Sequence, residues 1–270
     1  MYPSGPLGQH RRGRGGGAPC HDLPVIPVPD DRDPDGVVRI RAPNASPMTL
    51  DGTNTYLVAG WVVDPGPAHE GHQSAILAAA GNRIEGVALT HSHPDHSAGA
   101  APLARRAGNV PVVMPRDGEE VGPFRAVATP GHALDHVCLL LGRICMAGDV
   151  VMGEGSVLIT PGEGALSAYL DSLRRLRALD LELLCPGHGS YIRHPQAKLD
   201  EYLAHRLERE RMLLEALEAG ARTEDALLKR AWADAPAALR PAAAVTLRAH
   251  LEKLAGEGRL PEGLEAGLVE

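Results

Sequence analysis

The chain has 270 residues, which is enough for one large domain with its own hydrophobic core and a small second domain. Its formal net charge of −7 and its aromatic content of 3% argue against a protein that binds nucleic acid through a basic surface or by base stacking. No apolar run approaches the ~20 residues of a membrane span, and the four cysteines lack C-x-x-C spacing, so we expect a protein of the reducing cytoplasm with no membrane partner.

The first 35 residues are rich in Gly, Pro and Arg, which predicts a flexible leader over residues 1–35. Apolar runs then predict strands at residues 36–40, 54–60, 61–66, 83–91, 110–115, 123–132, 136–142, 143–149 and 181–189. Runs with helical periodicity cover residues 74–80, 98–108 and 164–180. Most of the predicted strands from Arg83 onward end in a loop that carries His or Asp. This order predicts an α+β fold with two sheets, helices outside them and a functional site along one sheet edge.

A long charged helix is predicted over residues 195–219, with Pro at its start and Gly just beyond its end. It links the sheet region to residues 220–270, where a helix cap at Thr223 and two helical runs have the size and order of a winged-helix-like domain. We therefore expect a large domain over residues 36–219, followed by this small one. The run HRLERER at residues 205–211 is typical of a solvated helix face, although one of its arginines could instead reach a cleft and bind an anion.

The densest group of metal-binding residue types lies in the run LTHSHPDHSAGA at residues 89–100. It contains His91, His93, Asp95 and His96. In an extended loop, residues i, i+2 and i+4 point the same way, so we expect His91, His93 and Asp95 to converge and His96 to be turned aside. One short loop would then supply two neighbouring metal positions. Neutral imidazole with carboxylate is a donor set that suits zinc.

Three further candidates follow predicted strands and lie in Gly-containing turns. They are His132 in TPGH, Asp149 in AGD and His188 in PGHG. Taken singly, each histidine could be a core residue bonded to the backbone, and Asp149 could cap a turn. Taken together and in this order after the histidine-rich run, they indicate a metal centre.

The motifs THSHPDH, TPGH, AGD and PGHG resemble those of the metallo-β-lactamase superfamily over residues 36–189. The resemblance implies an αββα sandwich. It further implies that His91, His93 and His132 hold one metal ion, that Asp95, His96 and His188 hold a second, and that Asp149 bridges both. The superfamily often has two glycines after the Asp-His pair, whereas the second position here is Ala100, a change that we expect a helix start to tolerate.

The activity implied is that of a dinuclear zinc-dependent hydrolase with two Zn²⁺ ions per chain, although the donor set also suits Mn²⁺ or Fe²⁺. Two such ions would lower the pKa of a shared water molecule, and the resulting bridging hydroxide would be the nucleophile for a carbonyl or phosphorus centre. Asp95 would be the catalytic residue that orients the hydroxide and takes part in proton transfer. True β-lactamases usually lack a carboxylate at the position of Asp149, which argues against antibiotic hydrolysis.

Six further residues are candidates for orienting the metal ligands or for binding substrate: Asp64, Thr90, Asp135, His136, Arg193 and His194. The first four could fix imidazole tautomers through hydrogen bonds. Arg193 and His194 lie just beyond PGHG, where they could anchor an anion or simply form part of an exposed loop.

The runs GTNTYLV and AYLDSLRRL, together with the C-terminal region, resemble the β-lactamase-like protein 2 subgroup, whose animal member is a single-strand-specific endoribonuclease. The subgroup also resembles thioesterases. Three functions therefore remain open: an RNA phosphodiesterase, a hydrolase of thioesters or other carboxylic esters, and a non-catalytic protein that binds nucleic acid or a partner. The partner would accordingly be RNA or a small acyl or ester substrate, and the small domain could also make a homodimer. Residues 221–270 hold seven basic and eight acidic residues, which does not favour RNA binding by this part.

Overall fold

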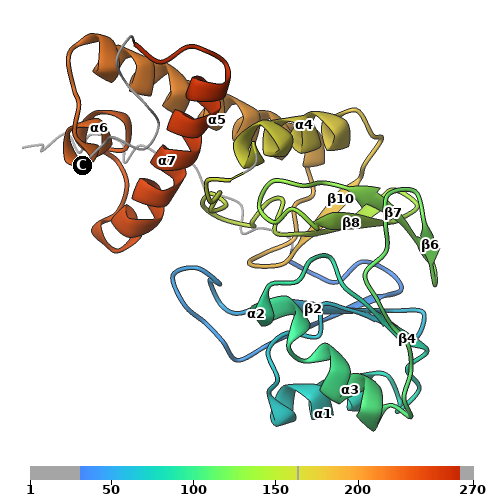
Figure 1. Ribbon diagram of the computed structural model, residues 1–270. Helices are drawn as coiled ribbons and strands as arrows, with labels where there is room; N and C mark the ends of the chain where they lie inside the picture. The colour runs from blue at the N-terminus through green and yellow to red at the C-terminus, as the bar shows by residue number, and fades with distance from the viewer. Residues whose placement is uncertain (1–30, 163, 262–270) are drawn as a thin grey trace, which may run out of the picture.

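The computed structural model describes residues 31–162 and 164–261, and two five-stranded sheets face one another at its centre (Figure 1). The first sheet has its strands in chain order: β1 (Val37–Arg41), β2 (Asn54–Val58), β3 (Trp61–Val63), β4 (Gly86–Ala88) and β5 (Val112–Val113). The pairs from β1 to β3 are antiparallel, and those from β3 to β5 are parallel. Because β3 and β4 are parallel, their carboxyl ends lie at the same sheet edge.

The second sheet has the order β10-β9-β8-β7-β6. Its strands are β6 (Glu120–Val121), β7 (Phe124–Ala128), β8 (Val137–Leu141), β9 (Ile144–Gly148) and β10 (Leu183–Pro186). All pairs are antiparallel except β9 with β10, which are parallel and joined through a helix. The carboxyl ends of β9 and β10 therefore also share one edge, and each is followed closely by a predicted metal ligand.

Helices cover the outer face of each sheet and complete four layers (Figure 1). Helices α1 (Glu70–Ala79) and α3 (Ala100–Arg106) cover the first sheet, and α4 (Ala165–Arg177) covers the second. The core between the sheets includes Tyr56, Val63, Phe124, Leu139 and Met146. The predicted αββα sandwich is confirmed. It forms because the strands present apolar side chains on both faces, and because α4 buries one apolar stripe, Leu166, Leu170, Leu173 and Leu176.

A small helical domain follows the sandwich. Its elements are α5 (Pro195–Glu218), α6 (Glu224–Ala231), the short 3-10 helix η1 (Ala237–Leu239) and α7 (Arg240–Gly256). Thr223 caps α6 by accepting a hydrogen bond from the Ala226 amide, as expected. The first half of α5 packs on α4, whereas its second half shares a core with α6 and α7 through Leu213 and Leu217. Helix α5 thus contacts both the sandwich and the small domain, and up to residue 261 no strand follows α7.

Near the end of the predicted leader, the carboxylate of Asp31 lies 2.6 Å from Arg39 and accepts a hydrogen bond from the Tyr191 amide. One prediction requires correction within the described residues. The charged run at residues 205–211 is not simply a solvated face, because Arg206, Arg209 and Glu210 are buried. The sandwich and α7 cover that side of α5. Residues 1–30, which make up most of the predicted leader, lie outside the described residues.

Cys138, Cys145 and Cys185 are buried and unpaired, in line with a role as small apolar core residues. None of the helices in the described residues combines the length and the apolar character needed to cross a membrane.

Candidate metal centre

The first group of candidate ligands consists of His91, His93 and His132, whose ring nitrogens lie within 4.8 Å of one another. His91 and His93 lie in the loop after β4, and His132 follows β7 in the second sheet. Nδ1 of His132 donates a hydrogen bond of 2.9 Å to the Leu158 carbonyl, which leaves the lone pair of Nε2 directed into the group. That Nε2 lies 2.9 Å from Nδ1 of His93. Two imidazole nitrogens facing each other at this distance are suited to share a cation or a proton.

The second group consists of Asp95, His96, Asp149 and His188, again with ligand atoms within 4.8 Å. The expectation that Asp95 would point with His91 and His93, and His96 away, was wrong. The chain is extended only up to His93, because Pro94 starts the helical turn α2 (Pro94–Ser97). This turn directs both Asp95 and His96 into the second group, where Oδ2 of Asp95 lies 3.3 Å from Nε2 of His188.

Asp149 belongs to the second group and also faces the first. Its Oδ2 is 3.6 Å from Nε2 of His132 and 3.3 Å from Nε2 of His188. Its Oδ1 is 3.4 Å from Nε2 of His96. Because one carboxylate faces nitrogens of both groups, Asp149 has the position that a bridging ligand requires.

Buried polar atoms without hydrogen bonds point to a cation at this site. Nε2 of His91, Nε2 of His96 and Oδ1 of Asp149 are buried and have no hydrogen-bond partner among the described residues. Such an atom costs about 1–3 kcal/mol unless something compensates it, and metal coordination would compensate all three. The backbone leaves room for this, since a Cβ at Gly187 would meet both Asp149 and the His96 ring. These donors fit a metal centre of nitrogen and oxygen ligands.

The protonation of these groups reflects burial and mutual charge. Burial lowers the pKa of His91 to about 2, so its ring is neutral and available as a ligand. Burial also disfavours charge on His188, but hydrogen bonds to Asp149 and Asp95 outweigh it and raise its pKa to about 9. Burial would raise the pKa of Asp149, yet the neighbouring His96 and His188 hold it well below its usual range. The carboxylates are therefore ionised and attract positive charge to this point.

Asp64 and Thr90 contact the ligands directly. Asp64 Oδ2 accepts hydrogen bonds from Nδ1 of His96 at 2.9 Å and from the Thr90 hydroxyl at 2.6 Å. The Thr90 hydroxyl in turn lies 3.0 Å from Nδ1 of His91. Asp64 thus fixes the tautomer of His96, and through Thr90 that of His91, so that both Nε2 atoms face the centre. The parallel pairing of β3 with β4 explains the contact, because Asp64 and Thr90 follow the carboxyl ends of these strands.

His136 positions Asp149 from the opposite side. Its Nε2 accepts a hydrogen bond of 3.1 Å from the Asp149 amide, and its Nδ1 lies 2.8 Å from the Thr129 hydroxyl. Burial lowers the pKa of His136 to about 3, so the ring stays neutral and keeps Nε2 as an acceptor.

The three other candidates are not brought into contact with the ligands. Asp135 is partly buried and His194 is exposed, and neither side chain makes a hydrogen bond within the described residues. Arg193 donates to the Arg32 carbonyl and lies over the Tyr191 ring. The carbonyls of Leu158 and Gly52 face Nδ1 of His132 and Nδ1 of His188. No sequence pattern predicts these two contacts, because backbone carbonyls are the same at every position.

Comparison with known protein families agrees with the fold and the arrangement of these residues. The family model described as metallo-beta-lactamase superfamily matches residues 48–128 and 116–188. The chain belongs to the metallo-β-lactamase superfamily. A second model, the beta-lactamase associated winged helix domain, matches residues 223–262, which confirms the predicted class of the small domain. As a member of this superfamily, the protein is a hydrolase.

Two relatives illustrate the range of the superfamily around this chain. The Beta-lactamase-like protein 2 homolog of Caenorhabditis elegans is 32% identical over 256 residues, covering 83% of this chain and 85% of the relative. The Atrochrysone carboxyl ACP thioesterase of Aspergillus fumigatus is 33% identical over 228 residues, covering 75% of this chain and 71% of the relative. The predicted likeness to the β-lactamase-like protein 2 subgroup is therefore confirmed.

Solved structures show the same fold. A metallo-beta-lactamase family protein from Thermus thermophilus superposes with a TM-score of 0.67 at 24% identity, covering 86% of this chain and 97% of that one. A beta-lactamase domain protein from Burkholderia ambifaria gives a TM-score of 0.69 at 19% identity, covering 90% and 95%. Both likenesses extend over most of the chain and so include the small domain.

Proposed function

We propose that this protein is a dinuclear, zinc-dependent hydrolase of thioesters or other carboxylic esters. The observation that carries the dinuclear part is that Asp149 faces nitrogens of both ligand groups, close to buried nitrogens that have no hydrogen-bond partner among the described residues. His91, His93 and His132 would hold one ion, and Asp95, His96 and His188 the other. Zinc suits this set of imidazole and carboxylate ligands, and Mn²⁺ or Fe²⁺ would fit the same donors.

Bound metal ions would act as Lewis acids that polarise the ester carbonyl and make water acidic near neutral pH. The protein's own residues do the positioning. Asp149 is 7% exposed and belongs to the interior, whereas the Asp95 side chain is 33% exposed and is the carboxylate that substrate and water can reach. Asp95 would therefore orient the attacking water and take up its proton, while Asp64, Thr90 and His136 keep the ligands in place.

For the substrate, the charges of the small domain favour an acyl compound over RNA. Its basic side chains are largely neutralised: Lys229 pairs with Asp225, Arg248 with Glu224, and Lys253 with Glu210. A surface that binds a phosphate backbone needs basic groups that are free for phosphate. The similarity to a relative named as an acyl carrier protein thioesterase supports the same choice. Of the three functions that the sequence leaves open, we therefore place the ester hydrolase ahead of the RNA phosphodiesterase.

One experiment decides between the two substrate classes. The purified protein is given an S-acyl thioester and a single-stranded RNA, each with and without EDTA and at two salt concentrations. We expect thioester hydrolysis that EDTA abolishes, that added Zn²⁺ restores and that salt changes little. RNA cleavage that exceeds thioester hydrolysis and weakens steeply with salt would replace this proposal with a phosphodiesterase.

The dinuclear arrangement is tested by Asp149→Ala. We expect this variant to lose at least 100-fold in kcat/KM and to bind fewer metal ions per chain, measured by elemental analysis after gel filtration. The matched control is Asp135→Ala, a carboxylate of the neighbouring loop that makes no side-chain hydrogen bond within the described residues. An Asp149→Ala protein with two metal ions and full activity would contradict the bridging role.

A further inference from the structure

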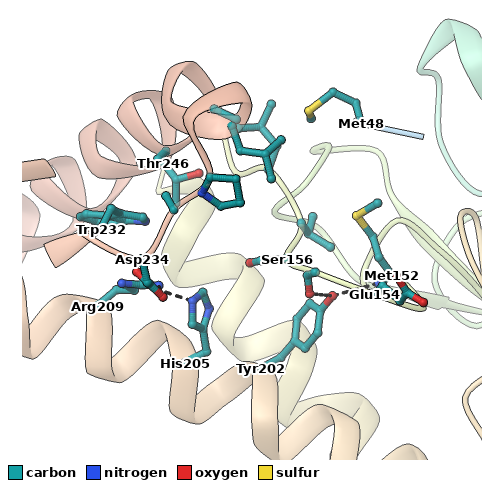
Figure 2. Close-up of a pocket in the computed structure, with 18 of the residues that line it drawn as sticks. Met48, Met152, Glu154, Ser156, Tyr202, His205, Arg209, Trp232, Asp234 and Thr246 are labelled. Atoms are coloured by element: carbon teal, nitrogen blue, oxygen red, sulfur yellow. Dashed lines mark hydrogen bonds and ion pairs between the residues drawn. The ribbon is translucent and has the colours of Figure 1, made fainter. Parts of the chain in front are cut away.

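A cavity of about 480 Å³ lies between the sandwich and the small domain (Figure 2). Figure 2 shows Met48 and Met152 of the sandwich on one side and Trp232 and Thr246 of the small domain on the other. Helix α5 forms its floor through Tyr202, His205, Arg206 and Arg209. The volume falls in the range of about 300–1,000 Å³ that is typical of pockets for small organic ligands, and the lining is mostly apolar.

The walls of this cavity are also the supports of the metal centre. Leu158 lines the cavity, and its carbonyl accepts the hydrogen bond from His132. Met152 and Gly155 line it as well, and between them the Gly153 amide donates to the carbonyl of His188. A molecule in the cavity therefore lies next to the backbone that holds two of the candidate ligands, His132 and His188.

Arg206 is the unusual residue of this cavity. It is 2% exposed, yet no carboxylate in the described part of the chain lies within ion-pair distance of its guanidinium. Nη2 donates to the Val157 carbonyl, the guanidinium carbon lies 5.4 Å from the centre of the Tyr169 ring, and Nε is buried without a partner. A buried cation is normally paired, because removing its hydration costs several kcal/mol.

The neighbouring charges do not supply the missing partner. Arg209 is paired with Asp234 at 2.7 Å, and Glu201 on the rim is paired with Lys198 at 2.9 Å. Glu154 lines the outer part of the cavity and is exposed to solvent. His250, from α7, is fully buried with both ring nitrogens unpaired, and burial followed by the charge of Arg206 lowers its pKa to about 3. Among the residues that line the cavity, Arg206 therefore provides a buried positive charge without a carboxylate partner in the described part of the chain.

We infer that this cavity binds the acyl part of the substrate as an apolar chain whose far end carries a carboxylate paired with Arg206. The apolar walls take up the chain, and Arg206 gains the counter-charge that the described residues do not provide. The small domain is then part of the substrate site, because α7 and the segment around Trp232 form one wall. The identification of the ligand as the acyl part of a substrate rests on the proposed function. The binding of an apolar carboxylate in the cavity does not depend on it.

Trp232 allows binding to be measured without any catalysis, since the chain has only two tryptophans and Trp61 can be replaced. In a Trp61→Phe protein freed of metal with chelator, decanoate and 1-decanol are titrated below micelle-forming concentrations while Trp232 fluorescence is followed. We expect both to alter the fluorescence saturably, with decanoate binding at least tenfold more tightly. Arg206→Met should remove this preference and leave the affinity for decanol unchanged.

A second variant keeps the test decisive if Arg206→Met does not fold. Ala242→Phe fills the cavity from α7 without replacing any residue of α5, and it should weaken the binding of decanoate and decanol alike. The inference is overturned if neither compound alters Trp232 fluorescence, if both bind equally to the unaltered cavity, or if Arg206→Met still prefers decanoate. Binding without thioester hydrolysis would contradict only the proposed function, whereas hydrolysis without binding would contradict only this inference.

Discussion

Asp64 is linked by hydrogen bonds to candidate ligands of both groups, directly to His96 and through Thr90 to His91. Its two carboxylate oxygens bind the Thr90 amide, the Thr90 hydroxyl and Nδ1 of His96. Its backbone adopts a left-handed conformation with φ of 49°, which is uncommon for any residue but glycine and which Asn and Asp adopt most readily among the others. One side chain therefore fixes a ligand from each group, and the chain accepts local strain to place it there.

Asp64→Asn tests this connection at the scale of the single residue. The amide keeps the size of the side chain and tolerates the left-handed backbone, but it is neutral and cannot accept at both oxygen positions. We expect metal affinity to fall about 10–100-fold, as is usual when a partner of a ligand is lost. A competition titration with a chromophoric chelator measures this, with the exposed Asp51→Asn as control. Equal affinity in the two variants would show that Asp64 does not orient the ligands.

At the scale of the secondary-structure elements, the contact between α5 and α7 buries ionisable side chains. Glu210 of α5 is 5% exposed and pairs with Lys253 of α7 at 2.7 Å and with Arg259. In the same region His250 is buried and neutral, with its ring 5.6 Å from that of Trp232. The contact between the two helices therefore includes one satisfied ion pair and one histidine that resists protonation.

His250 makes the small domain sensitive to acid. Its pKa is about 3 in the folded protein and 6.5 in the unfolded chain, so below pH 6.5 protonation favours the unfolded state. Stability is lost at about 1.4 kcal/mol per pH unit between these two values. In metal-free protein, His250→Phe should therefore lose about 2 kcal/mol less than the unaltered chain between pH 6.5 and pH 5. Urea unfolding followed by Trp232 fluorescence measures the difference, and identical pH slopes would contradict it.

The accuracy of prediction from sequence also differs between elements. The stripe on α4 and the cap of α6 were predictable because periodicity and capping are local properties of the chain. The turn α2 and the two-residue strand β6 are too short to produce a periodic signal. The run at residues 205–211 predicts a solvated face of α5, whereas Arg206 and Glu210 are buried, because the elements that cover them are distant in sequence. The candidate ligands were predictable because histidine and aspartate side chains follow one predicted strand after another. The backbone carbonyls that support them were not predictable, because they are the same at every position.

At the scale of the whole molecule, two pairs of parallel strands explain why one site forms. Strands β3 and β4 in one sheet and β9 and β10 in the other bring their carboxyl ends to the same end of the sandwich. Seven candidate ligands thus come from loops of both sheets, and their carboxylates and imidazole rings face one another. Metal ions would join the two sheets at this point and stabilise the folded state by mass action.

Removal of metal should therefore lower the melting temperature of the whole sandwich. At a free Zn²⁺ concentration 100 times the dissociation constant, binding adds about 2.7 kcal/mol to the free energy of unfolding. Calorimetric scans of chelator-treated protein, with and without added Zn²⁺, measure the shift. Asp149→Ala should show a smaller shift than Asp135→Ala. A melting temperature that is independent of Zn²⁺ in the unaltered protein would argue against a metal centre between the sheets.

The segment at Val157 and Leu158 has a consequence for how ligands influence one another. The Val157 carbonyl accepts a hydrogen bond from Arg206, and the next carbonyl, that of Leu158, accepts one from His132. Two consecutive peptide units thus connect Arg206 in the cavity to His132 in the metal centre. If an anion at Arg206 shifts these peptides, it changes the affinity of His132 for metal, and metal at His132 must change the affinity for the anion by the same factor. Binding in the cavity and binding at the metal centre would then influence one another through two consecutive peptide units.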